Sequence, residues 1–107
     1  MTQEPIFTLI FAPEVIDHLR VIDRNLHTLI RGTIAQKLSY TPLELTRNRK
    51  SLEQPAPFGA TWELRFGANN RFWVFYEVDA TEQIVLVLAI GIKDREKLIV
   101  GGEEIGL

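Results

Sequence analysis

Residues 62–79 read WELRFGANNRFWVFYEVD, and this stretch decides the fold. Two runs of largely apolar residues flank the four residues Gly-Ala-Asn-Asn, a composition typical of a turn. The stretch therefore predicts a β-hairpin with strands over residues 60–66 and 71–79. Each strand carries an arginine close to the turn, Arg65 and Arg71, with aromatic residues around it.

The two faces of the predicted hairpin differ in character, because successive side chains of a strand point to opposite faces. One face of the second strand carries the residues expected to pack under helices: Phe72, Val74, Tyr76 and Val78. The other face carries Arg71, Trp73 and Phe75, and Arg65 of the first strand joins them. Trp73 and Phe75 are too apolar for a surface left bare to water, so we expect another group to cover them.

The chain before the hairpin predicts one strand and two helices. An apolar strand over residues 6–11 precedes Pro13, which suits the first position of a helix. Asp23 can cap a second helix. The first helix has apolar residues at helical spacing at Val15, Ile16, Leu19 and Ile22. The second has an apolar stripe expected to face the sheet, namely Leu26, Leu29, Ile30, Ile34 and Leu38.

The element order predicts an α+β domain. Residues 43–59 form a charged, proline-containing loop, residues 82–91 a central strand that is apolar on both faces, and Gly101-Gly102 part of a flexible terminus. The order β-α-α-β-β-β is typical of two N-terminal helices packed on one face of a small antiparallel sheet. A length of 107 residues suits one domain over residues 1–107.

Composition excludes several kinds of chemistry. The chain has no cysteine, which removes disulfides, thiolate metal sites and thiol nucleophiles. The two histidines, His18 and His27, do not have the spacing of a metal site, and we expect no metal and no cofactor. The apolar run at 84–92 is too short to span a membrane, and no basic segment precedes the first apolar stretch. These features predict a cytoplasmic protein without membrane contact.

Positive charge is concentrated in one segment. The whole chain has a net charge of −2, but residues 47–71 contain five basic and two acidic residues, so this segment carries +3 and the remainder −5. The basic residues are Arg47, Arg49, Lys50, Arg65 and Arg71. Such a segment indicates either a phosphate-binding surface or a solvated loop that happens to be rich in arginine.

The sequence resembles the RelE/ParE superfamily of type II toxin–antitoxin toxins over nearly its whole length. The resemblance lies in the element order, the loop TRNRKSLEQ (46–54), the hairpin, and the strand that leads into AIGIKDREKL (89–98). The RelE branch implies a ribosome-dependent mRNA endoribonuclease, and the ParE branch implies a DNA gyrase inhibitor that does not cut nucleic acid. A toxin-like binding module without activity is a third alternative.

The resemblance also implies roles for individual residues. Cleavage of the RelE kind uses the ribose 2′-hydroxyl as nucleophile, so the protein must stabilise negative charge on the neighbouring phosphate. Arg71 matches the phosphate-stabilising arginine of the family, and Lys93 and Arg95 match the basic residue near the leaving group. The residues expected to contact the RNA backbone are Arg47, Arg49, Lys50 and Arg65.

One departure from the family pattern concerns proton transfer. Relatives of the RelE branch often carry a tyrosine or histidine near the C-terminus, where this chain has Ile99. No clear general base remains, and the carboxylates that could stand in are Glu63, Glu77 and Asp94.

The resemblance further implies an antitoxin partner that wraps the toxin. Trp73 and Phe75 are expected to be exposed in the isolated chain and covered by the antitoxin, because apolar burial needs a partner that stays. Stacking of these two rings on RNA bases is the alternative.

Overall fold

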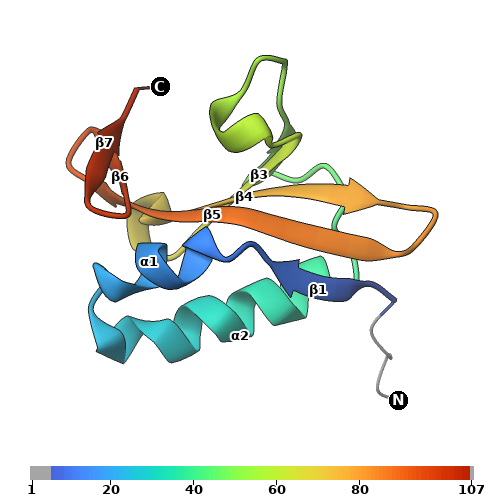
Figure 1. Ribbon diagram of the computed structural model, residues 1–107, viewed down its shortest axis with the longest axis horizontal. Helices are drawn as coiled ribbons and strands as arrows, with labels where there is room; N and C mark the ends of the chain where they lie inside the picture. Colours follow the sequence, from blue (N-terminus) through green and yellow to red (C-terminus); the bar gives the residue numbers. More distant parts are fainter. Residues whose placement is uncertain (1–5, 107) are drawn as a thin grey trace.

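The computed structural model describes residues 6–106 and shows a seven-stranded sheet with two helices on one face (Figure 1). The strands are β1 (Thr8–Phe11), β2 (Arg49–Ser51), β3 (Trp62–Phe66), β4 (Phe72–Asp79), β5 (Ile84–Asp94), β6 (Lys97–Val100) and β7 (Glu103–Ile105). The helices are α1 (Glu14–Arg20) and α2 (His27–Leu38), and η1 (Arg24–Leu26), η2 (Pro57–Gly59) and η3 (Ala68–Asn70) are short 3₁₀ turns. The α+β class with helices on one face is confirmed. In the described part of the chain, no helix is long and apolar enough to span a membrane.

The sheet is larger than the sequence predicts. Its order is β2-β3-β4-β5-β6-β7, and β1 pairs with β5 in parallel, whereas every other pair is antiparallel. The segment predicted as a loop contains β2, whose sequence Arg-Lys-Ser has no apolar alternation that would reveal a strand. The terminus predicted to be flexible, from Gly101 onward, forms a hairpin turn and β7, which pairs with β6. That prediction was wrong because Gly101 and Gly102, both at positive φ, make the turn.

The hairpin β3–β4 is confirmed, and its turn explains the Gly-Ala-Asn-Asn sequence. Gly67 has φ +84°, and a Cβ at this position would lie 2.8 Å from the ring of Phe72. Asn69 and Asn70 also adopt the left-handed region, at φ 58° and 53°, which asparagine tolerates better than most residues. The turn therefore requires glycine at its first position and favours asparagine at the last two.

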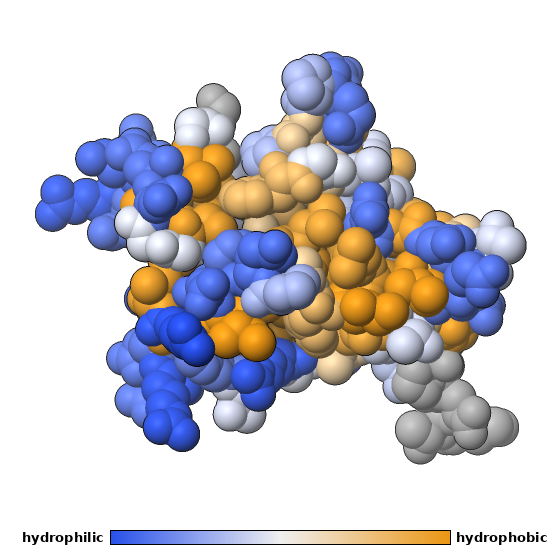
Figure 2. Space-filling model, in the orientation of Figure 1, coloured by the Kyte–Doolittle hydropathy of each residue, from blue (hydrophilic) through white to orange (hydrophobic). Residues whose placement is uncertain are grey.

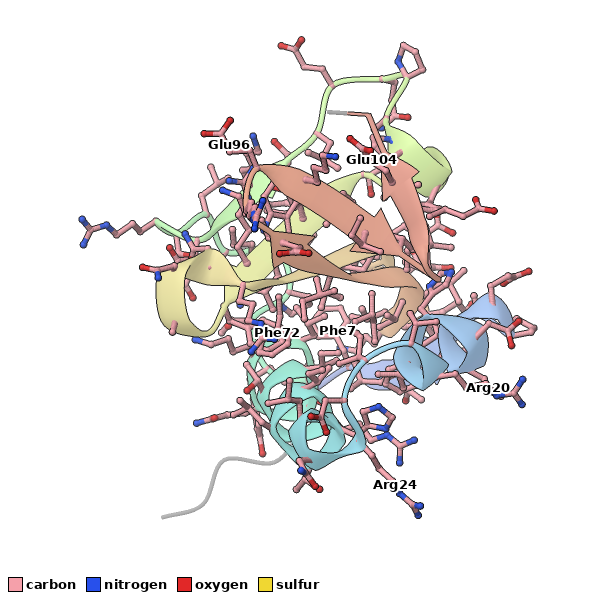
Figure 3. All side chains as sticks on the ribbon, turned by 90° about the vertical axis from the view of Figure 1, so that its left-hand side faces the viewer. Phe7, Arg20, Arg24, Phe72, Glu96 and Glu104 are labelled. Atoms are coloured by element: carbon pink, nitrogen blue, oxygen red, sulfur yellow. The ribbon has the colours of Figure 1, made fainter. Side chains whose placement is uncertain are left out.

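The main core lies between the sheet and the helices. Phe72, Val74 and Tyr76 are buried there against the stripe of α2, and Figure 3 shows Phe7 and Phe72 between the two layers. The stripe is narrower than predicted. Its buried members are Ile30, Ile34 and Leu38, and Leu26 is partly buried. Leu29 is 52% exposed, so the prediction that it faces the sheet was wrong, and Ile16 of α1 is 61% exposed.

A second apolar cluster lies on the opposite face of the sheet and contains Trp73 and Phe75. Their exposed fractions are 3% and 1%, so the prediction that they are exposed in the isolated chain was wrong. The chain itself covers them. The other buried members are Ala60, Ala89, Leu98 and Val100, with Leu52, Leu88 and Ile105 packed at the margin. Figure 1 shows β6, β7 and the segment before β3 on this side of the sheet.

Gly91 allows the second cluster to close. A Cβ at this position would lie 2.8 Å from Leu98 and 2.9 Å from Val100, both on the neighbouring strand β6. The glycine therefore permits the side chains of β6 to lean across β5 toward Trp73, which is opposite Gly91 on β4.

His18 of α1 fills a gap in hydrogen bonding along one edge of β5. β1 pairs with β5 at residues 84–87 and β6 pairs with it at residues 91–94. Between them, the backbone N–H of Ile90 donates to Nδ1 of His18 at 3.3 Å. The ring must be neutral at Nδ1 to accept this bond. Burial lowers the pKa of His18, although the charges of Asp17 and Glu14 oppose the change.

Acidification should therefore destabilise the fold through His18. Because the pKa is lower in the folded chain, the unfolded chain binds the proton more readily, and stability is lost as the pH falls below about 6.5. We expect the urea midpoint of the wild type to fall more between about pH 8 and about pH 5 than that of His18→Asn, which keeps an acceptor but does not titrate. Equal changes in both proteins would contradict this role of His18.

Candidate functional site

The antiparallel order brings basic residues from several strands to one end of the sheet. At this end β2 begins, β3 ends, β4 begins, β5 ends and β6 begins. The basic residues at or next to these strand ends are Arg47, Arg65, Arg71, Lys93, Arg95 and Lys97. We call this region the cationic end. Acidic residues flank the opposite strand ends, at Glu53, Asp79, Glu82 and Glu103. Asp94 and Glu96 also lie at the cationic end, and Lys97 pairs with Glu104 at 3.9 Å, so basic residues outnumber acidic ones there without excluding them.

Arg71 and Lys93 are neighbours at the cationic end. The backbone N–H of Lys93 donates to the carbonyl oxygen of Arg71 at 2.7 Å. β5 continues to Asp94, so Lys93 lies within the strand rather than beyond it. Arg71 is exposed, Lys93 is half-buried, and neither forms an ion pair within residues 6–106. The two backbones are thus joined, and the guanidinium carbon of Arg71 lies 5.6 Å from the ring centre of Phe72.

Arg95 occupies a different setting from these two residues. It lies in the two-residue turn between β5 and β6, at φ 60°, and is exposed. Asp94 and Glu96 adjoin it and reduce the positive potential at the turn. Arg95 therefore adds a charge at the cationic end, but from a turn and not from a strand.

Arg65 lies on the face of the second cluster and is held from two sides. Its Nε donates to Oε2 of Glu63 at 2.8 Å, and its guanidinium carbon lies 3.7 Å from the ring centre of Trp73. Trp73 is itself fixed by its indole N–H, which donates to the carbonyl of Asn70 at 2.9 Å. Sequence alternation places Arg65 and Glu63 on one face, but it does not reveal that Glu63 is buried and paired.

Arg49 does not occupy the surface predicted for an RNA contact. It is 4% exposed, and its Nη1 donates to the carbonyl oxygens of Thr41 and Glu44. The guanidinium therefore connects β2 to the segment after α2. The prediction failed because charge alone does not show which arginine of a basic segment turns inward.

Arg47 and Lys50 remain exposed, as an RNA contact would require. Arg47 borders a cleft of about 460 Å³ that Lys37 and Thr46 also line. Lys50 lies opposite Glu63 in the register of β2 and β3. The two residues therefore extend the basic surface from Arg71 toward the edge strand β2.

Two side chains that pack against the central strands, His18 and Tyr76, could in principle transfer protons, but both are hydrogen-bonded within the fold. His18 accepts the Ile90 amide, and the hydroxyl of Tyr76 donates to the carbonyl of Pro42 at 2.6 Å. Burial raises the pKa of Tyr76 well above its ordinary value, with a smaller opposing effect from Arg49. Tyr76 thus stays protonated, and Ile99, at the position where relatives carry an acid or base, lies half-buried on β6.

An apolar surface is formed by β1 and α1. Ile10, Phe11 and Ile16 are 45%, 42% and 61% exposed, and Figure 2 shows apolar side chains gathered where β1 lies beside β5. A cleft of about 500 Å³ lies beside them, lined by Leu9, Phe11, Ala12, Pro13, Val15, Ile16, Leu19, Arg31, Ala35 and Ile90. Beyond its pairing with β5, the other edge of β1 pairs with no strand among residues 6–106.

Comparison with known proteins supports the fold. No protein-family model matches the sequence, and no curated protein matches it. Among solved structures, a chain of the toxin–antitoxin complex RelBE2 from Mycobacterium tuberculosis is similar, with a TM-score of 0.60 and 23% identity. The likeness covers 84% of this chain and 100% of that one. The RelE-like fold expected from the sequence is thereby confirmed.

Proposed function

We propose that the protein is the toxin of a type II toxin–antitoxin pair and acts in the cytoplasm on mRNA held by the ribosome. The observation that carries this proposal is the cationic end, where the backbones of Arg71 and Lys93 are hydrogen-bonded and neither side chain has an ion-pair partner among the described residues. RNA is a polyanion, and arginine and lysine side chains without ion-pair partners bind its phosphates.

In the proposed reaction the ribose 2′-hydroxyl attacks the adjacent phosphorus, and the bond to the 5′-oxygen of the next nucleotide breaks. The 2′-hydroxyl gives up its proton to water and the departing 5′-oxygen takes up a proton, so that the products are a 2′,3′-cyclic phosphate and a free 5′-hydroxyl. Arg71 stabilises the added negative charge on the phosphate, and Lys93 of the adjoining strand neutralises charge on the departing oxygen. Arg47 and Lys50 bind neighbouring phosphates of the strand.

A second candidate is a toxin that binds its target without cutting RNA, such as a DNA gyrase inhibitor. The hydrogen bonds of His18 and Tyr76 favour it, because Nδ1 of His18 and the hydroxyl of Tyr76 are already hydrogen-bonded within the fold. A binding function needs only the charged surface and no proton-transfer group.

Inducible expression in bacteria separates the two candidates. Growth arrest with new 5′ ends detected by primer extension on transcripts supports mRNA cleavage. Growth arrest with intact transcripts and inhibited gyrase supercoiling supports the second candidate. Normal growth at high expression, with folded protein, would contradict both.

We expect the antitoxin to bind the apolar surface of β1 and α1 rather than Trp73 and Phe75, which the chain already buries. Phe11→Glu should weaken binding of the antitoxin encoded beside the gene by at least about 2 kcal/mol, the scale of a buried interface aromatic. The measurement is calorimetric titration. Leu45→Glu is the matched control, because Leu45 is 69% exposed and does not line the cleft. Equal losses in both variants would contradict this placement.

A further inference from the structure

A cleft beside the cationic end has the chemistry of a nucleobase site. It measures about 380 Å³, at the low end of ligand pockets. The sheet forms its floor, and the segment before β3 and the end of β7 form its walls. The lining residues are Lys50, Leu52, Pro55, Pro57, Glu63, Arg65, Trp73, Phe75 and Gly106.

On the floor of the cleft, the guanidinium group of Arg65 is stacked on the indole of Trp73. The guanidinium plane of Arg65 lies over the indole of Trp73, and its ion pair with Glu63 fixes it from the side. The side chain of Arg65 is still 32% exposed. In proteins that bind single-stranded RNA, unpaired bases stack on such guanidinium planes as well as on aromatic rings. The side chain of Arg65 is therefore already fixed before a base binds.

The floor of the cleft also contains a carboxylate with unused acceptor capacity. Glu63 is 4% exposed, and among residues 6–106 its recorded side-chain partner is Arg65, which donates to Oε2. An ionised carboxylate accepts about four hydrogen bonds and donates none. A ligand that fills the cleft beside Glu63 must therefore offer donors on adjacent atoms.

We infer that this cleft binds the guanine base of a single-stranded RNA whose phosphates lie along the cationic end. Guanine is the RNA base whose Watson–Crick edge places two donors side by side, N1–H and the N2 amino group, and these match the acceptor positions that Arg65 leaves open on Glu63. Adenine and cytosine place an acceptor next to their amino group, and uracil has one donor between two carbonyls, so each brings a lone pair toward Glu63.

The charge of the cleft favours a nucleotide over a basic peptide as its ligand. The cleft holds two cations, Lys50 and Arg65, and one anion, Glu63. This net positive charge opposes an arginine or lysine side chain and favours a ligand that joins a donor-rich neutral base to a phosphate. The inference builds on the proposed RNA target, but it concerns which base is bound and does not require cleavage.

The test measures binding of the trinucleotides UpGpU, UpIpU and UpApU to the full chain, with tryptophan fluorescence as the readout. Inosine differs from guanosine only by the missing N2 amino group. Loss of a hydrogen bond to a buried charge should weaken UpIpU roughly tenfold relative to UpGpU, and UpApU should bind more weakly still. Equal affinities for the three, or no binding of any, would overturn the inference.

Variants then assign the preference to Glu63. Glu63→Gln should bind UpGpU and UpIpU equally. The control Glu77→Gln removes the same charge beside a different cleft, formed with Val78, Asp79, Ile84 and Leu86, and should keep the preference. Lys50→Ala should weaken all three trinucleotides and keep their order. If Glu63→Gln does not fold, the wild-type comparison of guanosine with inosine still decides.

These experiments distinguish failure of the guanine site from failure of the proposed mRNA cleavage. A protein that leaves transcripts intact but prefers UpGpU retains the base site without the nuclease activity. A protein that cuts transcripts without preferring guanosine over inosine overturns the base site alone. Tighter binding of an arginine-containing peptide than of UpGpU would also overturn it.

Discussion

Replacing Trp73 with alanine is expected to lower the free energy of unfolding by about 3–5 kcal/mol, the usual loss for a buried tryptophan. The indole packs against Phe75 and beneath Arg65, and its N–H bonds Asn70. Removing it leaves a cavity in the second cluster and removes the ring on which the guanidinium of Arg65, paired with Glu63, is packed. Since small domains are marginally stable, much of the variant should be unfolded at 37 °C. Urea denaturation measures the effect.

Leu29→Ala is the matched control. Sequence patterning places Leu29 in the core and Trp73 outside it, and the structure reverses both positions. Leu29 is half-exposed on α2, and alanine is a good helix former, so its replacement should change stability by less than about 1 kcal/mol. A stable Trp73→Ala together with an unstable Leu29→Ala would contradict the assignment of both side chains.

Replacing Arg71 with alanine is expected to reduce transcript cleavage by about a hundredfold or more while the protein stays folded. Arg71 is exposed at the start of β4, and its recorded hydrogen bond to Lys93 uses the backbone oxygen, which alanine retains. The substitution removes the charge and the contact of the guanidinium with the ring of Phe72, 5.6 Å from its centre. Primer extension on transcripts measures cleavage, and circular dichroism measures folding.

Arg20→Ala provides the control for charge removal. Arg20 is exposed on α1 and pairs with Asp17, and Figure 3 shows its side chain pointing outward from the helical layer. The variant loses the same charge and should cut normally. A folded Arg71→Ala protein that also cuts normally would place the active surface elsewhere.

The elements that sequence reasoning finds are those with a strong local pattern. The hairpin β3–β4 carries alternation, a turn glycine and two asparagines, and α2 carries a stripe at helical spacing. β2 is too short and polar to alternate, and β7 has two glutamates in its three residues. Both exist because a neighbouring strand offers hydrogen bonds, which is a tertiary effect that no local pattern records.

The candidate site was predictable in part because some of its residues also lie in segments with a strong local pattern. Alternation assigns Arg65, Arg71 and Trp73 to one face, and the position of Lys93 after the central strand brings it to the same end. The burial of Trp73 depends on β6 and β7, which the sequence does not reveal. The inward turn of Arg49 depends on carbonyl oxygens of Thr41 and Glu44 that become available only in the folded chain.

Titration of the ¹⁵N-labelled protein with a short single-stranded RNA, followed by NMR, tests most directly whether the cationic end binds a polyanion. The largest amide shifts should map to residues 47–50, 65–71 and 93–97, and the apparent affinity should fall steeply as salt is raised. Residues near Asp79 and Glu103, at the opposite strand ends, should not shift. Shifts confined to β1 and α1, or no salt-dependent shifts at the cationic end, would contradict the account.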